Sequence, residues 1–306
     1  MTTVHTAQAT SRRDVWFWSG PDRCHAWLYV PDREMPASGF ATVVMAHGFA
    51  ATKVMRLDAY AEAFCAAGYA VLVFDYRYFG DSEGEPRELL DIDAQLADWR
   101  AAVSFARSQF EVDPDRVALW GTSFAGGHVV ATAAQDRRIA AVIAQCPFTD
   151  GVASARSSDR SGALTLMRKA IADARSAKRG GEPVRVAVAG RPGDLAMMTA
   201  ADVADGYASI VPEGTTHRNM IPARIALKVT NYRPGRLARD TRCPLLMYVC
   251  MDDSVAPPGA AIKYAGQAPL GEVYRFGGGH FDIYTGDAFV ETITAQLEFL
   301  QRVLPA

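Results

Sequence analysis

The stretch VALWGTSFAGGH, residues 117–128, constrains the fold of this chain more than any other. Four apolar residues end at Gly121, and mostly small, apolar residues follow Ser123 without a proline. This pattern predicts a buried strand that turns at once into a helix. Such a turn holds Ser123 at its tip, beside helix N–H groups that could bind an oxyanion. Gly121 allows the backbone angles that so sharp a turn requires.

The stretch departs at one place from the Gly-x-Ser-x-Gly pattern of a nucleophile elbow. Ala125 stands where the second glycine would be, and Gly126 and Gly127 follow it. We expect one methyl group to be tolerated there. Taken alone, the stretch is also compatible with an ordinary Gly/Ser loop between a strand and a helix.

Apolar runs alternate with segments of helical periodicity along most of the chain. We expect strands at 40–46, 70–74, 117–120, 139–144, 245–250 and 272–276, and helices at 54–67, 91–108, 124–134, 258–268 and 288–303. This alternation predicts a parallel sheet with helices on both faces. Aromatic-rich runs at 15–19 and 25–30 predict an antiparallel hairpin before it.

The segment from about residue 150 to residue 240 has a different pattern. It contains charged runs and a Val/Ala strip interrupted by Gly190, Pro192 and Gly193, with no convincing buried strand before Pro244. We interpret it as a mainly helical cap inserted into a core formed by residues 1–149 and 241–306. Such a cap would lie over the C-terminal ends of the strands, where ligands bind in open α/β sheets.

Composition places the chain among ordinary globular proteins: 49% of its 306 residues are hydrophobic and 22% are charged. A net charge of −2, with both signs scattered, gives no indication of a nucleic-acid or membrane partner. The first residues have no apolar core of a signal peptide, so we expect a cytoplasmic protein. The five cysteines form no CxxC pair, which favours buried free thiols over disulfides or a zinc site.

Two later features bear on the role of Ser123. Asp252 and Asp253 directly follow the strand predicted at 245–250, and His280 follows three glycines after the strand predicted at 272–276. Both would lie at the same edge of the sheet as Ser123. The chain order Ser, Asp, His is the order of the α/β-hydrolases.

From about Phe40 to Ala306 the chain therefore resembles an α/β-hydrolase of the serine esterase kind. The segments that carry the resemblance are His47-Gly48-Phe49 for the oxyanion loop, DYRYFGDSEG after the next strand, Asp253-Ser254-Val255-Ala256-Pro257 for the acid and GGGHFD for the histidine loop. The elbow half is also similar to the dienelactone-hydrolase and prolyl-oligopeptidase branches, although Ser replaces the Cys of the former. The resemblance implies a mostly parallel, doubly wound sheet of about eight strands.

A chemical hypothesis follows for each of these residues. Ser123 would attack an acyl carbon, His280 would carry its proton to the leaving group, and Asp253 would orient His280. The backbone N–H groups of Phe49 and Phe124 would bind the oxyanion. Asp252 is the competing acid; the spacing of Asp253 to Val255 and Pro257 favours Asp253.

The other histidines are expected to be structural. His128 lies five residues after Ser123 on the same helix, which turns it away from the tip, and His47 would shape the oxyanion loop. His5, His25 and His217 occur singly. Because there is no HExxH motif and no GxGxxG loop before a helix, we expect neither a metal nor another cofactor.

The substrate is the least determined part of the prediction. Six side chains could line its pocket or could equally be core: Tyr78, Phe79, Phe148, Met197, Met198 and Tyr207. We favour a small to medium uncharged acyl or aryl ester or lactone. An acyltransferase or thioesterase acting on carrier-bound acyl groups is the alternative, and a non-catalytic binding protein is the third hypothesis. The oligomeric state stays open, a homodimer included.

Overall fold

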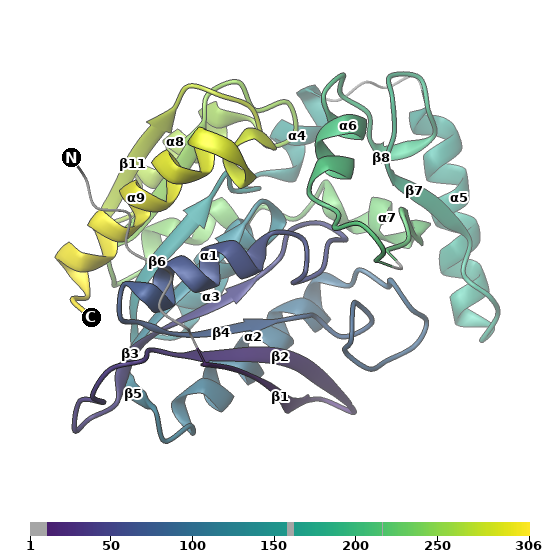
Figure 1. Ribbon diagram of the computed structural model, residues 1–306. Helices are drawn as coiled ribbons and strands as arrows, with labels where there is room; N and C mark the ends of the chain where they lie inside the picture. Colours follow the sequence, from purple (N-terminus) through teal and green to yellow (C-terminus); the bar gives the residue numbers. More distant parts are fainter. Residues whose placement is uncertain (1–10, 158–161, 216) are drawn as a thin grey trace.

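The computed structural model describes residues 11–157, 162–215 and 217–306, and its main feature is a sheet of eight strands (Figure 1). The strand order is β1-β2-β4-β3-β5-β6-β10-β11. The strands are β1 (Ser11–Ser19), β2 (Asp22–Val30), β3 (Phe40–Ala46), β4 (Ala70–Phe74), β5 (Val112–Thr122), β6 (Ile139–Gln145), β10 (Leu245–Cys250) and β11 (Gly271–Phe276). Strand β2 pairs antiparallel with both β1 and β4, and the other six strands run parallel to one another.

Helices cover both faces of this sheet. Helices α1 (Leu57–Ala66) and α9 (Gly286–Val303) contact each other on one face. The other face is covered by α2 (Ile92–Arg107), α3 (Phe124–Gln135) and α8 (Pro258–Ala265). The doubly wound, mostly parallel sheet that the sequence predicts is thus confirmed.

Local chemistry explains why these segments form their elements. All seven residues of β3 are buried, as expected of a strand covered on both faces. Helix α2 begins after Asp91, whose side chain accepts hydrogen bonds from the backbone N–H groups of Asp93 and Ala94. On α1 and α9, Tyr60 and Phe289 pack together, and Tyr60 also packs on Trp120 of β5.

The segment between β6 and β10 forms a second, smaller unit. Its elements are α4 (Gly151–Ser157), α5 (Ala163–Lys178), β7 (Arg185–Ala189), β8 (Ala196–Met198), α6 (Val203–Ser209), β9 (Met220–Pro222), η1 (Ala223–Ile225), α7 (Ala226–Val229) and η2 (Pro234–Asp240). As expected, this unit contains more helical residues than strand residues. The expectation of no buried strand before Pro244 is wrong, however, because β8, β7 and β9 form a three-stranded sheet in that order.

The small sheet escaped the sequence analysis because its strands are short. Two of them have three residues, too few to show an alternating pattern. A buried carboxylate links this unit internally: Asp173 of α5 accepts from the backbone of Val184 and from both backbone and side chain of Arg224. In Figure 1 the small sheet and α5 lie at one side of the molecule, opposite α9.

The C-terminal edge of the parallel strands gathers the polar residues singled out above. His47 follows β3, Ser123 follows β5, Asp253 follows β10 and His280 follows β11. None of the described helices is both long and apolar enough to cross a membrane.

Candidate active site

Ser123 occupies a sharp turn between β5 and α3. Its backbone has φ 56° and ψ −117°, a conformation that non-glycine residues rarely adopt. Hydrogen bonds hold the turn: the Ser123 N–H donates to the carbonyl of Gln145, and the Ser123 carbonyl accepts from the N–H groups of Gly126 and Phe148. A Cβ on Gly121 would lie 2.4 Å from the carbonyl oxygen of Ala125. Glycine is therefore required where the strand turns into the helix.

The loop after β3 approaches the same serine closely. A Cβ added to Gly48 would lie 2.8 Å from the Cβ of Ser123 and 3.3 Å from its Oγ. Within the described part of the chain, the backbone N–H groups of Phe49 and Phe124 donate to no protein acceptor. The two rings pack edge to face at 5.3 Å. Two backbone N–H donors, one next to Gly48 and one next to Ser123 in the chain, are thus free for a ligand.

Ser123, His280 and Asp253 form a continuous hydrogen-bonded chain. His280 Nε2 lies 3.0 Å from Ser123 Oγ, and His280 Nδ1 lies 2.7 Å from Asp253 Oδ2. With the proton on Nδ1, the ring donates to the carboxylate and its Nε2 can accept the serine proton. The second carboxylate oxygen of Asp253 accepts from the N–H groups of Val255 and Ala256, at 2.8 and 2.7 Å. Asp252 is exposed and does not take part.

The surroundings of His280 favour its charged form. Burial by itself lowers the pKa of an imidazole, but the Asp253 carboxylate and the nearby Cys146 raise the pKa of His280 well above its ordinary value. By contrast, burial lowers the pKa of His47 to about 4 and that of His128 to about 3. Among the histidines that the structure describes, His280 is thus the one whose pKa is raised, and its ring lies beside Ser123.

His47 and His128 have the structural roles expected of them. His47 packs edge to face against Tyr76 and Phe79 under the loop that carries Gly48. His128 is fully buried and contacts the Gln95 side chain and the Tyr232 hydroxyl, at 2.9 and 2.6 Å. In the part of the chain that the structure describes, neither histidine forms a hydrogen bond with Ser123.

A buried ion pair supports the loop after β3. The ammonium of Lys53 lies 2.6 Å from Asp75 and 2.6 Å from the more exposed Asp81, and the Lys53 N–H donates to Asp75 at 2.7 Å. Lys53 and Asp75 are almost completely buried. Asp75 belongs to the DYRYFGDSEG segment. Its ion pair with Lys53 therefore joins the segment after β4 to the loop that carries Gly48.

A small cavity lies directly against the serine. Its lining comes from the core loops and from the segment between β6 and β10: His47, Gly48, Phe49, Ala51, Met55, Leu57, Thr122, Ser123, Met198, Tyr207, Ile210, His280, Phe281 and Tyr284. Apart from the two imidazoles, these described residues offer no ionisable group that is charged at neutral pH. The volume is about 30 Å³, enough for one or two water molecules.

Known proteins match the chain over most of its length. It is 47% identical over 292 residues, 95% of either chain, to the quorum-quenching protein AidA of Acinetobacter baumannii (strain MDR-ZJ06). It is 30% identical over 286 residues to the thiohydrolase aneE of Aspergillus aculeatus, covering 90% of this chain and 88% of that protein. A family model described as X-Pro dipeptidyl-peptidase (S15 family) matches residues 19–168.

Solved structures agree with this match. The α/β-hydrolase GrgF from a Penicillium species has a TM-score of 0.79 at 24% identity, covering 97% of this chain and 100% of the other. The chain belongs to the α/β-hydrolase superfamily. A structure of DcsB in complex with its substrate analogue gives a TM-score of 0.82, again at 24% identity and with 97% and 100% covered. This α/β-hydrolase thus has relatives whose names refer to hydrolysis.

The predicted pocket residues of this α/β-hydrolase divide into two groups. Met198 and Tyr207 line the cavity, and the Tyr207 hydroxyl donates to the Ala50 carbonyl at 2.9 Å, joining α6 to the loop after β3. The other four do not line it. Phe79 packs on His47, and Phe148 packs on Phe124 and Tyr232. Met197 and Tyr78 pack against the hydrophobic core, which is the second of the two roles considered for them.

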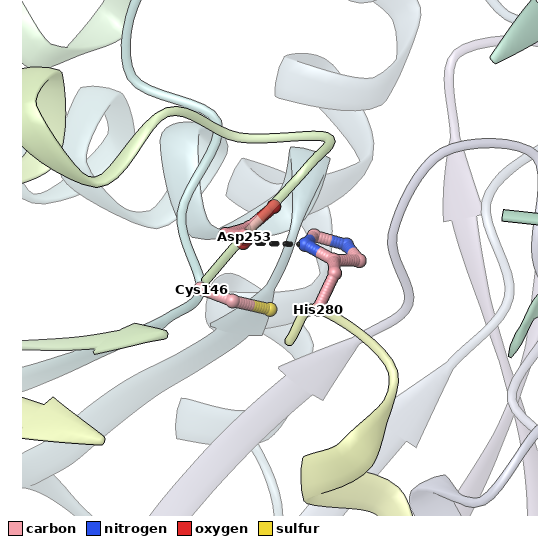
Figure 2. A group of neighbouring side chains, drawn as sticks. All are labelled: Cys146, Asp253 and His280. Carbon is pink, nitrogen blue, oxygen red and sulfur yellow. Dashed lines mark hydrogen bonds and ion pairs between the residues drawn. The ribbon is translucent and has the colours of Figure 1, made fainter. Parts of the chain in front are cut away.

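Sequence analysis missed several residues of this α/β-hydrolase site. Met55, Leu57, Ile210 and Phe281 line the cavity, and a signal existed only for Phe281, the neighbour of His280. Cys146, expected only as a buried thiol, lies beside His280 and Asp253 (Figure 2). It directly follows β6, so its position at the sheet edge was the available signal.

Among the described residues of the α/β-hydrolase, two groups of side chains could reach a single metal ion, namely Cys146, Asp253 and His280, and His25, Asp75 and Asp81. Most of their ligand atoms already have partners. In the first group His280 contacts Ser123 and Asp253, and in the second the ammonium of Lys53 lies between the carboxylates. A metal ion would have to displace these contacts, and we assign it to neither group.

Proposed function

We propose that this protein hydrolyses uncharged carboxylic esters, lactones included, with Ser123 as the nucleophile. The observation that carries the proposal is the apolar cavity directly against Ser123. Met55, Leu57 and Ile210 offer contacts to an acyl or aryl group and no partner for a charged one. A peptide with a free amine would need a carboxylate that the described lining lacks, which argues against the dipeptidyl-peptidase activity of the matching family.

In the proposed reaction Ser123 Oγ attacks the ester carbonyl while its proton moves to His280 Nε2. The N–H groups of Phe49 and Phe124 stabilise the oxyanion, each by about 3 kcal/mol. Protonated His280, stabilised by Asp253, then gives the proton to the leaving alcohol. Water, deprotonated by His280, releases the acid and regenerates Ser123. With a lactone, alcohol and acid stay in one product.

The size of the cavity limits the substrate. A volume of about 30 Å³ is far below the roughly 300 Å³ of a small-molecule pocket, so Met198 and Tyr207 would have to move aside for all but the smallest acyl groups. We therefore expect Met198→Ala to lower KM for longer acyl chains more than for acetyl esters. Equal effects on all chain lengths would mean that the acyl group lies elsewhere.

The relatives support the ester hypothesis and leave a second one. The name of the 47% identical relative refers to quenching of a signal, which hydrolysis of a small ester or lactone would achieve. The thiohydrolase at 30% identity favours a thioester instead, as do relatives named polyketide transferase and acyltransferase. Both chemistries pass through the same acyl-enzyme.

A matched substrate panel separates these hypotheses. We would measure kcat/KM for p-nitrophenyl esters of increasing chain length, for lactones by proton release, and for thioesters with the same acyl groups. Ester or lactone turnover about tenfold faster than that of the matched thioester would support the proposal, and the reverse ranking would assign a thioesterase. Ser123→Ala, the control, should lower kcat about 10⁴-fold or more. A wild-type protein without turnover on the whole panel would favour a binding protein.

A further inference from the structure

A row of arginines lines a second hollow, distinct from the Ser123 cavity. Arg233, Arg236 and Arg239 follow one another at intervals of three along η2 and the residue before it. Because a 3₁₀-helix has three residues per turn, the side chains of Arg236 and Arg239 lie above one another on the same face of η2. Lys263, Tyr264 and Gln267, in and just after α8, complete the lining.

The hollow has a volume of about 280 Å³ and shares no lining residue with the cavity of Ser123. In Figure 1, α8 lies beside β11, opposite the small sheet and α5. The hollow is thus a separate feature of the surface.

Positive charge exceeds negative charge at this hollow. Arg233 is bound to the buried carboxylate of Asp150 at 2.9 and 2.8 Å, and the Tyr264 hydroxyl donates to the same oxygen at 2.7 Å. Among the described residues, Arg239 forms an ion pair only with its exposed neighbour Asp240, at 3.8 Å. Within the described residues, no carboxylate is paired with Arg236 or Lys263. Four cations against one or two carboxylates leave two or three uncompensated positive charges, although the whole chain carries −2.

Like charges held in one row repel each other, and a bound anion would remove that repulsion. One guanidinium group can donate two parallel hydrogen bonds to two oxygens of a phosphate group, whereas an ammonium group cannot. Asp150 already fixes Arg233 and Tyr264, so part of the site is preformed. The volume suits a small ligand, and the charge suits one with several negative charges.

We propose that this arginine hollow binds a diphosphate group. The inference does not depend on the proposed function of Ser123. Its ligand would be either free diphosphate or the diphosphate of a nucleotide, which share the chemistry that the arginines and Lys263 recognise.

The test is calorimetric titration of the full chain with pyrophosphate at near-physiological salt. The double variant Arg236→Ala/Lys263→Ala removes the two cations without a carboxylate partner. Arg100→Ala/Arg137→Ala is the matched control, since it removes two exposed arginines outside the hollow. We expect the first variant to weaken binding by about tenfold or more and the control to change it by less than about twofold. Thermal unfolding of both variants verifies that each is folded.

Two further titrations distinguish the ligand and the mechanism. Tighter binding of ADP than of pyrophosphate would assign a nucleotide, and weaker binding would assign free diphosphate; both outcomes retain the site. Sodium sulfate at matched ionic strength should bind at least about tenfold more weakly. The proposal is overturned if pyrophosphate does not bind at millimolar concentration, if sulfate binds as well, or if both double variants lose affinity equally.

Discussion

Replacing Asp253 by Asn tests the proposed chemistry most sharply among single substitutions, because its effect follows from the hydrogen bonds at that side chain. One carboxylate oxygen accepts from the backbone N–H groups of Val255 and Ala256, and the other faces His280 Nδ1 at 2.7 Å. In Asp253→Asn the amide oxygen keeps the two backbone donors. The NH₂ group then points at His280, forcing Nδ1 to accept and leaving the ring proton on Nε2.

With the proton on Nε2, His280 cannot take one from Ser123. The wrong tautomer of a catalytic histidine costs about 10⁴ in kcat, or about 5.5 kcal/mol of transition-state stabilisation. Asp252→Asn is the matched control, since Asp252 is adjacent and exposed, and its side chain does not contact His280. We expect that control to keep kcat within about threefold of wild type.

The assay is steady-state hydrolysis of the best p-nitrophenyl ester, with thermal unfolding of both variants as a check on the fold. If the two substitutions reduce kcat equally, or if Asp252→Asn is the more damaging, Asp253 does not orient the base. An Asp253→Asn variant with normal kcat would also refute the proposed role of His280.

Three further predictions rest on separate contacts. Only the neutral imidazole can accept a proton, and the pKa of His280 is raised, so kcat/KM should fall with decreasing pH around a midpoint above 6.5. Asp253→Asn should lower that midpoint. A pH profile of the wild type with its midpoint below 6 would contradict this prediction. Gly48→Ala should lower kcat/KM by about 10²-fold or more, because the added methyl group would lie 3.3 Å from Oγ and 2.8 Å from Cβ of Ser123. Unchanged ester kinetics would mean that the loop moves freely and would contradict this prediction. Lys53→Met should lower the free energy of unfolding, measured in urea, by about 3 kcal/mol or more, because it leaves the buried Asp75 without its cation. Arg302→Met, at the exposed pair with Glu272, should lower it much less. Similar losses in both variants would argue against a special role for burial.

Much of the sheet could be predicted because its strands are continuous apolar runs. The bounds of β3, β4 and β10 coincide with the predicted runs at 40–46, 70–74 and 245–250. Strand β5 begins at Val112, earlier than the predicted 117–120. Asp113, Pro114 and Asp115 interrupt the apolar pattern there, so the first part of the strand leaves no hydrophobic signal.

The candidate site was predictable as far as it depends on strand ends. Ser123, Asp253 and His280 each follow a parallel strand, and such strands place their C-terminal ends at one edge. The cavity depends instead on how the segment between β6 and β10 folds back over that edge. Contacts such as Gly206 against Phe281, or the Tyr207 hydroxyl on Ala50, join residues far apart in sequence and leave no local pattern.

Cys146 illustrates the same limit. Its burial was predictable from the apolar run that precedes it, but its position beside His280 and Asp253 arises from the pairing of β6 with β10. Its backbone φ of 35° is positive, as is that of Ser123, so both residues have a backbone conformation that is rare for residues other than glycine.

Covalent labelling with a fluorophosphonate tests the central claim, the nucleophilicity of Ser123, most directly. Intact mass and peptide mapping should find one adduct on Ser123 in the wild type, none in Ser123→Ala, and a much slower reaction in Asp253→Asn. An adduct on another residue, Cys146 included, or a wild-type protein that stays unlabelled while folded, would contradict the account.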